Sequence, residues 1–301
     1  MDNIRLKTTV LVDNVDGDNL QGEWGLSFYI EYGDKTVLLD AGLSGLFADN
    51  AAKLGLDLGK ADFAVLSHAH DDHANGLDTF FECNDHAPMY VAAGCEENCY
   101  DKVDGHYQYA GIPRGILKRH ADRIIRAEDD KGSAVAGEDY TETGTAHKRG
   151  PIGGMQISEG IWLLRHTTPG LEKTGLMENM FLRLGESEYV PDDFSHEQSL
   201  IFELADGIVV FNSCSHAGAD VIIKEAMDAF PGRKILAMIG GFHLFNKTDD
   251  YVREFARRVE ATGVESIITG HCTGPKAMEI LQNELGDKVH ELKTGLEFVI
   301  D

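Results

Sequence analysis

The sequence is poor in the features that tie a chain to a membrane, to nucleic acid or to a disulfide scaffold. Its five cysteines, an odd number, do not form the disulfide framework of a small secreted domain. No apolar run reaches the roughly 20 residues that a membrane-spanning helix needs. The first residues also lack the apolar core of a signal peptide. We therefore expect a soluble, cytoplasmic chain with no membrane partner.

Basic residues are also scarce, with 27 lysines and arginines against 51 aspartates and glutamates, for a formal charge of −24. Affinity for nucleic acid depends largely on basic side chains that neutralise phosphates, so nucleic acid is an unfavourable partner. The 301 residues, 43% of them hydrophobic, can bury a large core. No internal repeat or low-complexity tract divides the chain. We expect a single domain over residues 1–301 that acts on a small molecule; its oligomeric state does not follow from the sequence.

The most informative stretch is Ser67-His68-Ala69-His70-Asp71-Asp72-His73, directly after the apolar run 63–66. His68 and His70 are two positions apart and can point the same way from an extended backbone. Asp72 and His73 would then face a second centre. Imidazole nitrogen and carboxylate oxygen are the ligands that Zn²⁺ takes when it keeps a position open for chemistry. One such residue alone would be an ordinary turn residue, but the cluster behind a buried strand predicts a metal site.

Three further apolar runs lead to a histidine. Residues 207–212 lead to His216, 234–239 to His243, and 266–269 to His271. Sites in sheets flanked by helices gather beyond the carboxyl ends of the strands. Together with the run before His68, these strands predict one cleft lined by histidines.

A fifth histidine, His196, is expected at the same cleft from hairpin geometry. The runs 198–204 and 208–212 flank the tight turn 205–207. Antiparallel pairing around this turn places His196 roughly opposite residues 214–216.

The remaining pattern is uneven. Strands are expected over residues 8–13, 24–32, 35–40, 88–92 and 161–165, and helices over 46–56 and from residue 76 onward. From about 94 to 160 the pattern is poor, and we interpret this region as a substrate-covering insertion. Its basic residues at 114–123 indicate a helix face paired with the acidic surface, or else a phosphate anchor. His166 is expected to be a loop residue, and Cys95 and Cys99 to be thiols rather than a structural zinc site.

The H-x-H-x-D-H pattern of residues 68–73 resembles the metallo-β-lactamase superfamily. The resemblance covers most of the chain and is weakest between about residues 95 and 188. It implies an α/β fold, the αβ/βα sandwich of two mixed sheets flanked by helices, with one or two metals in a cleft between the sheet edges. It also implies that Asp40 orients a metal-binding histidine through the other nitrogen of its ring. A carboxylate that caps a turn is the alternative for Asp40.

The elements Cys-Ser-His-Ala-Gly (214–218), Gly-Gly-Phe-His-Leu (240–244) and His-Cys-Thr-Gly (271–274) resemble a narrower branch. That branch is the 7,8-dihydropterin-6-methyl-4-(β-D-ribofuranosyl)aminobenzene-5′-phosphate synthases. The resemblance implies two divalent ions, Zn²⁺ first, with iron or manganese as alternatives. The implied ligands are His68, His70, Asp72, His73, His196, His216 and His271. Whether His196, Cys214 or His166 contacts metal stays open.

The resemblance implies a metal-dependent hydrolase, or a synthase of the pterin branch, that uses a metal-activated water on a small phosphorylated or pterin-like substrate. Asp72 would orient or shuttle a proton, and His243 would donate one to the substrate or leaving group. One alternative is a nuclease of the same fold, which the charge disfavours. Others are a non-catalytic metal-binding sensor and an iron redox site, whose usual flavin domain does not follow the fold here.

Overall fold

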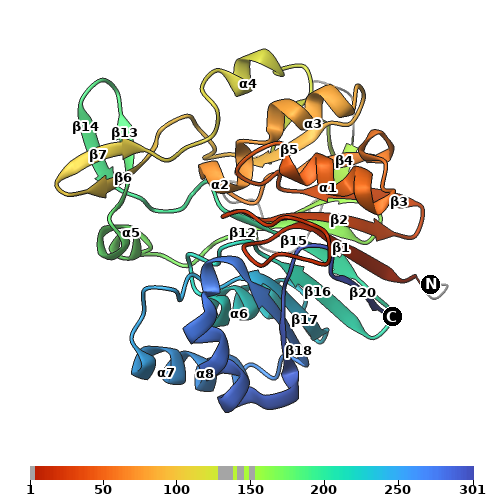
Figure 1. Ribbon diagram of the computed structural model, residues 1–301, viewed down its shortest axis with the longest axis vertical. Coiled ribbons are helices and arrows are strands. Elements are labelled where there is room, and N and C mark those ends of the chain that lie inside the picture. Colours follow the sequence, from red (N-terminus) through yellow and green to blue (C-terminus); the bar gives the residue numbers. More distant parts are fainter. Residues whose placement is uncertain (1–3, 128–137, 141–145, 149–152) are drawn as a thin grey trace.

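The computed structural model describes residues 4–127, 138–140, 146–148 and 153–301 (Figure 1). Two seven-stranded sheets lie face to face, and helices cover their outer faces. The first sheet has the order β20 (Glu297–Ile300), β1 (Leu6–Val12), β2 (Ser27–Tyr32), β3 (Lys35–Leu39), β4 (Phe63–Val65), β5 (Met89–Ala92), β8 (Ile124–Ala127). The second has the order β11 (Gly154–Ser158), β12 (Ile161–Arg165), β15 (Gln198–Glu203), β16 (Gly207–Phe211), β17 (Lys234–Gly241), β18 (Ser266–Gly270), β19 (Val289–Glu291).

Both sheets are mixed, and both change direction in the same way. The four strands from β20 to β3 are antiparallel, whereas β3, β4, β5 and β8 are parallel. In the second sheet β11, β12, β15 and β16 are antiparallel, and β16 to β19 are parallel. The parallel halves place the carboxyl ends of their strands at one edge of each sheet. The predicted αβ/βα sandwich is confirmed.

The layers follow from the alternation of side chains along each strand. In β1, Val10 packs between the two sheets while Leu11 packs beneath the helices. Between the sheets, Phe28 and Phe211 meet edge to face with ring centroids 5.6 Å apart. Each fully buried side chain of this size contributes roughly 1.5–3 kcal/mol. Because both faces of the central strands are buried, their sequences are apolar almost throughout.

Helices complete the two outer layers. The first sheet is covered by α1 (Leu46–Leu54) and α3 (Leu77–Cys83), and the second by α6 (Ala219–Ala229), α7 (Asp249–Glu260) and α8 (Pro275–Leu285). The predicted helix at 46–56 thus begins where expected and ends two residues early, at a left-handed Gly55. None of the helices in the described part of the chain combines the length and apolarity that crossing a bilayer requires.

The region interpreted as an insertion is only partly separate from the sandwich. Residues 124–127 and 154–158 belong to the two main sheets. Between them, β9 (Glu138–Tyr140) pairs with β10 (Ala146–Lys148), and residues 128–137, 141–145 and 149–152 lie outside the described residues. A four-stranded sheet of β14 (Glu188–Pro191), β13 (Met180–Leu184), β6 (Cys99–Val103) and β7 (His106–Tyr109) projects from the sandwich, at the left of Figure 1. That this region covers the substrate stays a prediction.

The basic stretch at 114–123 pairs mainly with the protein itself. Arg119, in the short helix α4 (Ile116–Arg119), lies 2.6 Å from a carboxylate oxygen of Asp78, and His120 lies 3.2 Å from the other oxygen. The guanidinium of Arg123 donates to backbone carbonyls of Asn84 and Ala87. These contacts favour the paired helix face over a phosphate anchor.

Candidate metal centre

The four strand ends that carry histidine converge, as the sequence predicts. His68 follows β4, and His216, His243 and His271 follow β16, β17 and β18. The ring centroids of His68 and His216 are 5.1 Å apart, and those of His216 and His243 are 4.6 Å apart. His73 completes the group, with its centroid 4.9 Å from that of His271.

A change of backbone direction divides the motif between two centres. His70 is extended, with φ −93° and ψ 153°, and is followed at once by the helical turn α2 (Asp71–Ala74). His68 and His70 therefore lie on one side, and Asp72 and His73 on the other. Among the described residues, five sets of donor atoms lie within 4.8 Å of one another, and two of these sets divide the motif in this way. The first set is His68, His70 and His216, and the second is Asp72, His73 and His271.

The first set leaves ring nitrogens without partners. Nε2 of His68 and both ring nitrogens of His216 are buried and, within the described residues, lack a hydrogen-bond partner. Burial lowers the pKa of both rings well below the ordinary value, and the neighbouring imidazoles lower it further. Buried polar atoms are nearly always paired. Unpaired neutral imidazole nitrogens that face one point fit a metal ion, because neutral imidazole is the form that binds metal.

The donor atoms of the second set are closely spaced. Nε2 of His271 lies 3.3 Å from Oδ2 of Asp72 and 3.1 Å from Nε2 of His73. Ligands that each lie roughly 2.1 Å from one ion are separated by about such distances. Burial would raise the pKa of Asp72, but His73 and His271 outweigh it and hold that pKa well below its usual range. The carboxylate is therefore charged, as a ligand must be.

Asp40 fixes the motif from behind, and its predicted contact with a candidate ligand is confirmed. Its Oδ2 accepts hydrogen bonds from Nδ1 of His73 at 2.9 Å and from Oγ of Ser67 at 2.7 Å. Its Oδ1 accepts the backbone N–H of Ser67 at 2.7 Å. The hydroxyl of Ser67 also lies 2.8 Å from Nδ1 of His68. Both rings are thereby held with Nε2 toward the cleft.

His271 is held by residues that the sequence analysis missed. Its backbone N–H donates to Asp13 Oδ2 at 2.9 Å, and its Nδ1 lies 3.0 Å from Oδ1 of Asn14. Burial raises the pKa of Asp13 to about 6. Asp13 and Asn14 lie more than 250 positions from His271, at the end of β1. No local pattern could have connected them.

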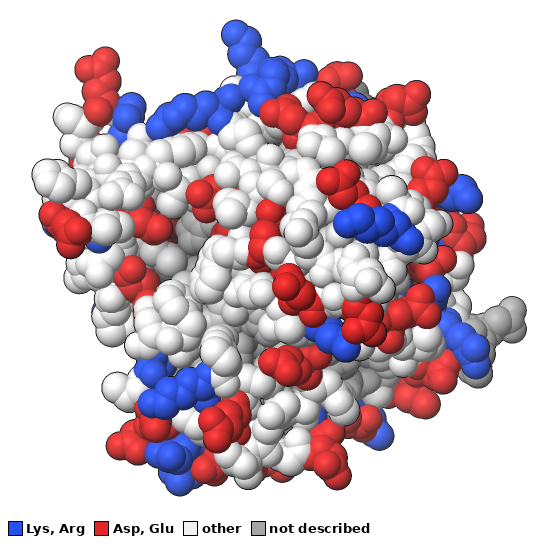
Figure 2. Space-filling view, in the orientation of Figure 1, with Lys and Arg blue, Asp and Glu red and all other residues white. Residues whose placement is uncertain are grey.

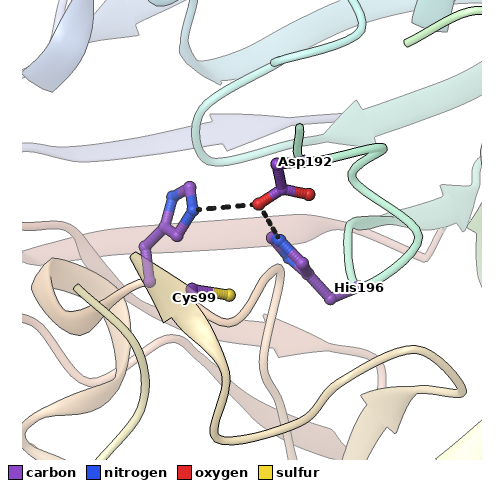
Figure 3. Close-up of side chains that lie close together, drawn as sticks. Cys99, Asp192 and His196 are labelled. Atoms are coloured by element: carbon purple, nitrogen blue, oxygen red, sulfur yellow. Dashed lines mark hydrogen bonds and ion pairs between the residues drawn. The ribbon is translucent and has the colours of Figure 1, made fainter. Parts of the chain in front are cut away.

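His196 is buried beside the cleft, with its ring centroid 5.2 Å from that of His70. Its Nδ1 accepts the backbone N–H of Ala69 at 3.1 Å, and its Nε2 lies 3.0 Å from Oδ2 of Asp192 (Figure 3). Both ring nitrogens are therefore used, and this arrangement leaves no lone pair for an ion. Oδ2 of Asp192 also lies 3.9 Å from Nε2 of His70. These bonds favour a supporting role behind His70, while direct metal binding by His196, in the buried set with His70, Cys99 and Asp192, stays a prediction.

Cys99 lies against the same group, and its thiol belongs to a buried set with His70, Asp192 and His196 (Figure 3). On the other side of the centre, Sγ of Cys214 lies 3.3 Å from Nε2 of His73. Cys214 therefore lies within reach of both centres, in a donor set with His68 and His73, and its contact with metal stays a prediction.

His166 lies in the loop after β12, as expected, but its side chain is buried between two carboxylates. Its Nε2 lies 2.6 Å from Glu197 and its Nδ1 lies 2.8 Å from Glu225. Burial alone would lower the pKa of His166, but the two carboxylates raise it to about 9. The other oxygen of Glu197 accepts the backbone N–H of His216 at 3.1 Å. His166 therefore supports the loop that carries His216 and contacts no candidate ligand with its own ring nitrogens.

His243 faces the first set from the end of β17, with φ +48°. Its Nε2 lies 3.5 Å from Oε2 of Glu178, while its Nδ1 is buried and lacks a hydrogen-bond partner among the described residues. Glu178 ends helix α5 (Glu172–Glu178) and also contacts Asn246 and Lys247. The sequence analysis missed Glu178, since nothing in the pattern links it to a residue 65 positions later.

Comparison with known proteins agrees with this geometry. The family model described as Metallo-beta-lactamase superfamily matches residues 25–167. The 7,8-dihydropterin-6-methyl-4-(beta-D-ribofuranosyl)-aminobenzene-5′-phosphate synthase of Methanocaldococcus jannaschii is 26% identical, over 98% of this chain and 96% of the relative.

Two solved structures share the fold. Tm1679, a metal-dependent hydrolase of the beta-lactamase superfamily, superposes with a TM-score of 0.74 at 24% identity, over 97% of this chain and 98% of that one. Zinc-bound PqqB from Methylobacterium extorquens superposes with a TM-score of 0.54 at 12% identity, over 97% and 99% of the two chains. In its motif, in the match over residues 25–167 and in its fold, the chain is similar to the metallo-β-lactamase superfamily.

Proposed function

We propose that this protein is a metal-dependent enzyme that uses an activated water on a small substrate with a phosphorylated or pterin-like group. The observation that carries the proposal is the pair of adjacent donor sets. In the first set, Nε2 of His68 and both ring nitrogens of His216 are buried without a hydrogen-bond partner among the described residues. The name of the relative from Methanocaldococcus jannaschii, which contains a dihydropterin and an aminobenzene phosphate, supports the substrate class.

The two sets divide the work of holding two divalent ions. His68, His70 and His216 would hold one, and Asp72, His73 and His271 the other. Imidazole and carboxylate ligands suit Zn²⁺ first and also iron or manganese. Two ions bound in this way lower the pKa of a water and offset the charge of a developing oxyanion.

His243 is the proposed proton donor. Glu178 lies at Nε2 of its ring, so Nδ1 is the atom left to exchange a proton with the substrate or leaving group. The ring lies against His216, so the proton would be delivered beside the first set of ligands. Asp72 would hold its ion and orient the attacking water.

Elemental analysis of untagged protein, purified without chelators, tests the proposal first. We expect close to two equivalents of metal per chain, followed by turnover of one member of a phosphoester, lactone and thioester panel that includes pterin phosphates. Asp72→Ala should abolish turnover. Well under one equivalent of metal in the wild-type protein would contradict the proposal.

His243→Ala separates a proton donor from a structural residue. Loss of one positioned acid costs on the order of a hundredfold in rate, so we expect that reduction with metal content near wild type. Glu178→Gln should shift the pH profile of turnover and leave metal content unchanged. An unchanged rate with a lowered melting temperature would show that His243 serves only the fold.

A further inference from the structure

Two large aromatic side chains lie exposed beside the candidate metal centre. Trp24 is 47% exposed and Phe245 is 50% exposed. Their rings meet edge to face, with centroids 5.6 Å apart and planes at 79°. The Trp24 ring lies 5.3 Å from the ring of His271, and the Phe245 ring lies 5.2 Å from that of His243. The pair therefore borders both a candidate ligand and the proposed proton donor.

The loop that carries Trp24 is fixed on both sides. The carboxylate of Glu23 accepts the backbone N–H of Ser44 at 3.0 Å and its hydroxyl at 2.6 Å. On the other side, a Cβ at Gly25 would lie 2.7 Å from the backbone oxygen of Asp72. Only glycine lets the backbone beside Trp24 pack this closely on the metal motif. Trp24 is thus exposed on an anchored backbone.

Phe245 is anchored to the opposite side of the centre. Its backbone N–H donates to the carbonyl of Cys272 at 3.1 Å, directly after His271. Gly274 has φ +77°, and a Cβ there would lie 2.9 Å from the Cα and Cβ of Phe245. Close packing therefore holds Phe245 at the mouth of the centre.

Exposure of both rings is unfavourable for the isolated chain, because burial of large apolar side chains is a main source of stability. Small-molecule sites typically combine apolar and aromatic walls with a few placed polar groups, and Trp24 and Phe245 lie beside such groups. Two ring planes near a right angle present a face and an edge to a third ring, and aromatic groups prefer both arrangements.

We propose that Trp24 and Phe245 form a stacking platform for a flat, conjugated ring of the substrate. The platform rests on the proposed function, because a ring stacked there would lie beside the candidate ligand His271 and the proposed proton donor His243. Loss of one stacking partner weakens the binding of a ring by roughly tenfold or more.

Tryptophan fluorescence can report on binding at the platform, because the chain contains only two tryptophans. The second, Trp162, lies in β12, where its Nε1 donates to Glu203 at 2.6 Å and its ring packs on Phe230. In metal-loaded Trp162→Phe protein, the fluorescence therefore reports on Trp24 alone. Two probes of similar size and charge would be titrated, the flat 4-hydroxybenzoate and the puckered trans-4-hydroxycyclohexanecarboxylate, which are both monoanions at neutral pH.

We expect 4-hydroxybenzoate to change the Trp24 emission and to bind about tenfold more tightly than the puckered probe. Adding Phe245→Leu should remove most of this preference, whereas Tyr251→Leu, at another exposed aromatic residue on α7, should not. Equal affinity of the two probes, no response of Trp24, or a preference that survives Phe245→Leu would each overturn the platform. Elemental analysis of the same preparations separates the two proposals, since full metal content without a ring preference refutes the platform alone.

Discussion

Asp192 is the buried carboxylate behind the candidate ligand His70, and His196 holds it there. Removing its charge while keeping its shape, with Asp192→Asn, should lower metal affinity about 10- to 100-fold, because the partner behind a ligand sets its orientation and basicity. Competition with a chromogenic chelator measures this change. Asp193→Asn is the matched control, since Asp193 is exposed and, within the described part of the chain, accepts only the N–H of Ser195. Lower stability with unchanged metal affinity would assign Asp192 to the fold alone.

His166 should make stability depend on pH. Its pKa rises from 6.5 to about 9 because the carboxylates of Glu197 and Glu225 outweigh the effect of burial. For a pKa raised by folding, the stabilisation is complete below pH 6.5 and is lost as the pH rises through about 9. The loss corresponds to roughly 3 kcal/mol.

Urea denaturation at pH 6, 7.5 and 9 would measure this change, with His166→Gln as the comparison. Glutamine can still donate a hydrogen bond but does not titrate. The free energy of unfolding of the wild type should therefore fall toward that of the variant as the pH rises. A difference between the two proteins that stays constant with pH would contradict a charged His166.

At the scale of elements, the strand ends that meet at the centre are conformationally unusual. Asp40, His243 and His271 each follow a strand with φ between +47° and +60°, where non-glycine residues are uncommon. Such conformations cost about 1–3 kcal/mol each and persist only where the surroundings enforce them. Here they turn side chains from three strands into one cleft.

The end of β17 should tolerate no side chain at Gly240. Its φ is +132°, and a Cβ would lie 1.9 Å from the backbone oxygen of Asn212, at the end of the neighbouring strand β16. Because both atoms belong to packed strands, Gly240→Ala should destabilise the protein by about 2 kcal/mol or more. Gly263→Ala is the control, since its φ of +77° is also left-handed but nothing lies within 4 Å of the added atom. Chemical denaturation of both variants measures the difference, and equal losses would show that the two strands can separate at little cost.

Element boundaries show where sequence patterns stop being informative. The run 161–165 forms a strand with the predicted bounds, because alternating and apolar patterns reflect burial directly. The run 24–32 was predicted as a strand, yet β2 begins only at Ser27. The backbone at Gly25 instead packs against Asp72, nearly 50 positions away, and this contact leaves Trp24 in a loop. A contact of that kind has no local signature.

At the scale of the whole molecule, local sequence patterns could predict the candidate ligands but not the residues that hold those ligands in place. The ligands follow strands or share one motif, so strand-end convergence could predict them. The supports Asp13, Glu178 and Glu225 come from distant segments and reach their histidines only through tertiary packing. For His196, the sequence could predict the position of the side chain but not the hydrogen bonds of its ring. Hairpin register predicts its place, but only the bonds to Ala69 and Asp192 show that its nitrogens are already used.

The surface charge bears on the nuclease alternative. Acidic side chains are scattered over the whole face shown in Figure 2, whereas basic ones gather in small patches, one of them at the top of the view. Several of the described basic groups are already paired, as Arg119 is with Asp78 and Lys276 with Asp249. The net charge of −24 would repel a partner with many phosphates.

We therefore predict no submicromolar binding of single-stranded or duplex nucleic acid at physiological salt. The measurement is a gel-shift titration of metal-loaded protein at 150 mM and 20 mM salt. Charge repulsion is screened within roughly 8 Å at the higher salt, so weak binding that relied on a local basic patch would strengthen at the lower salt. Tight binding of RNA at 150 mM salt would contradict the prediction. It would also move the proposed substrate from a small molecule to a phosphodiester chain, processed by the same two sets of ligands.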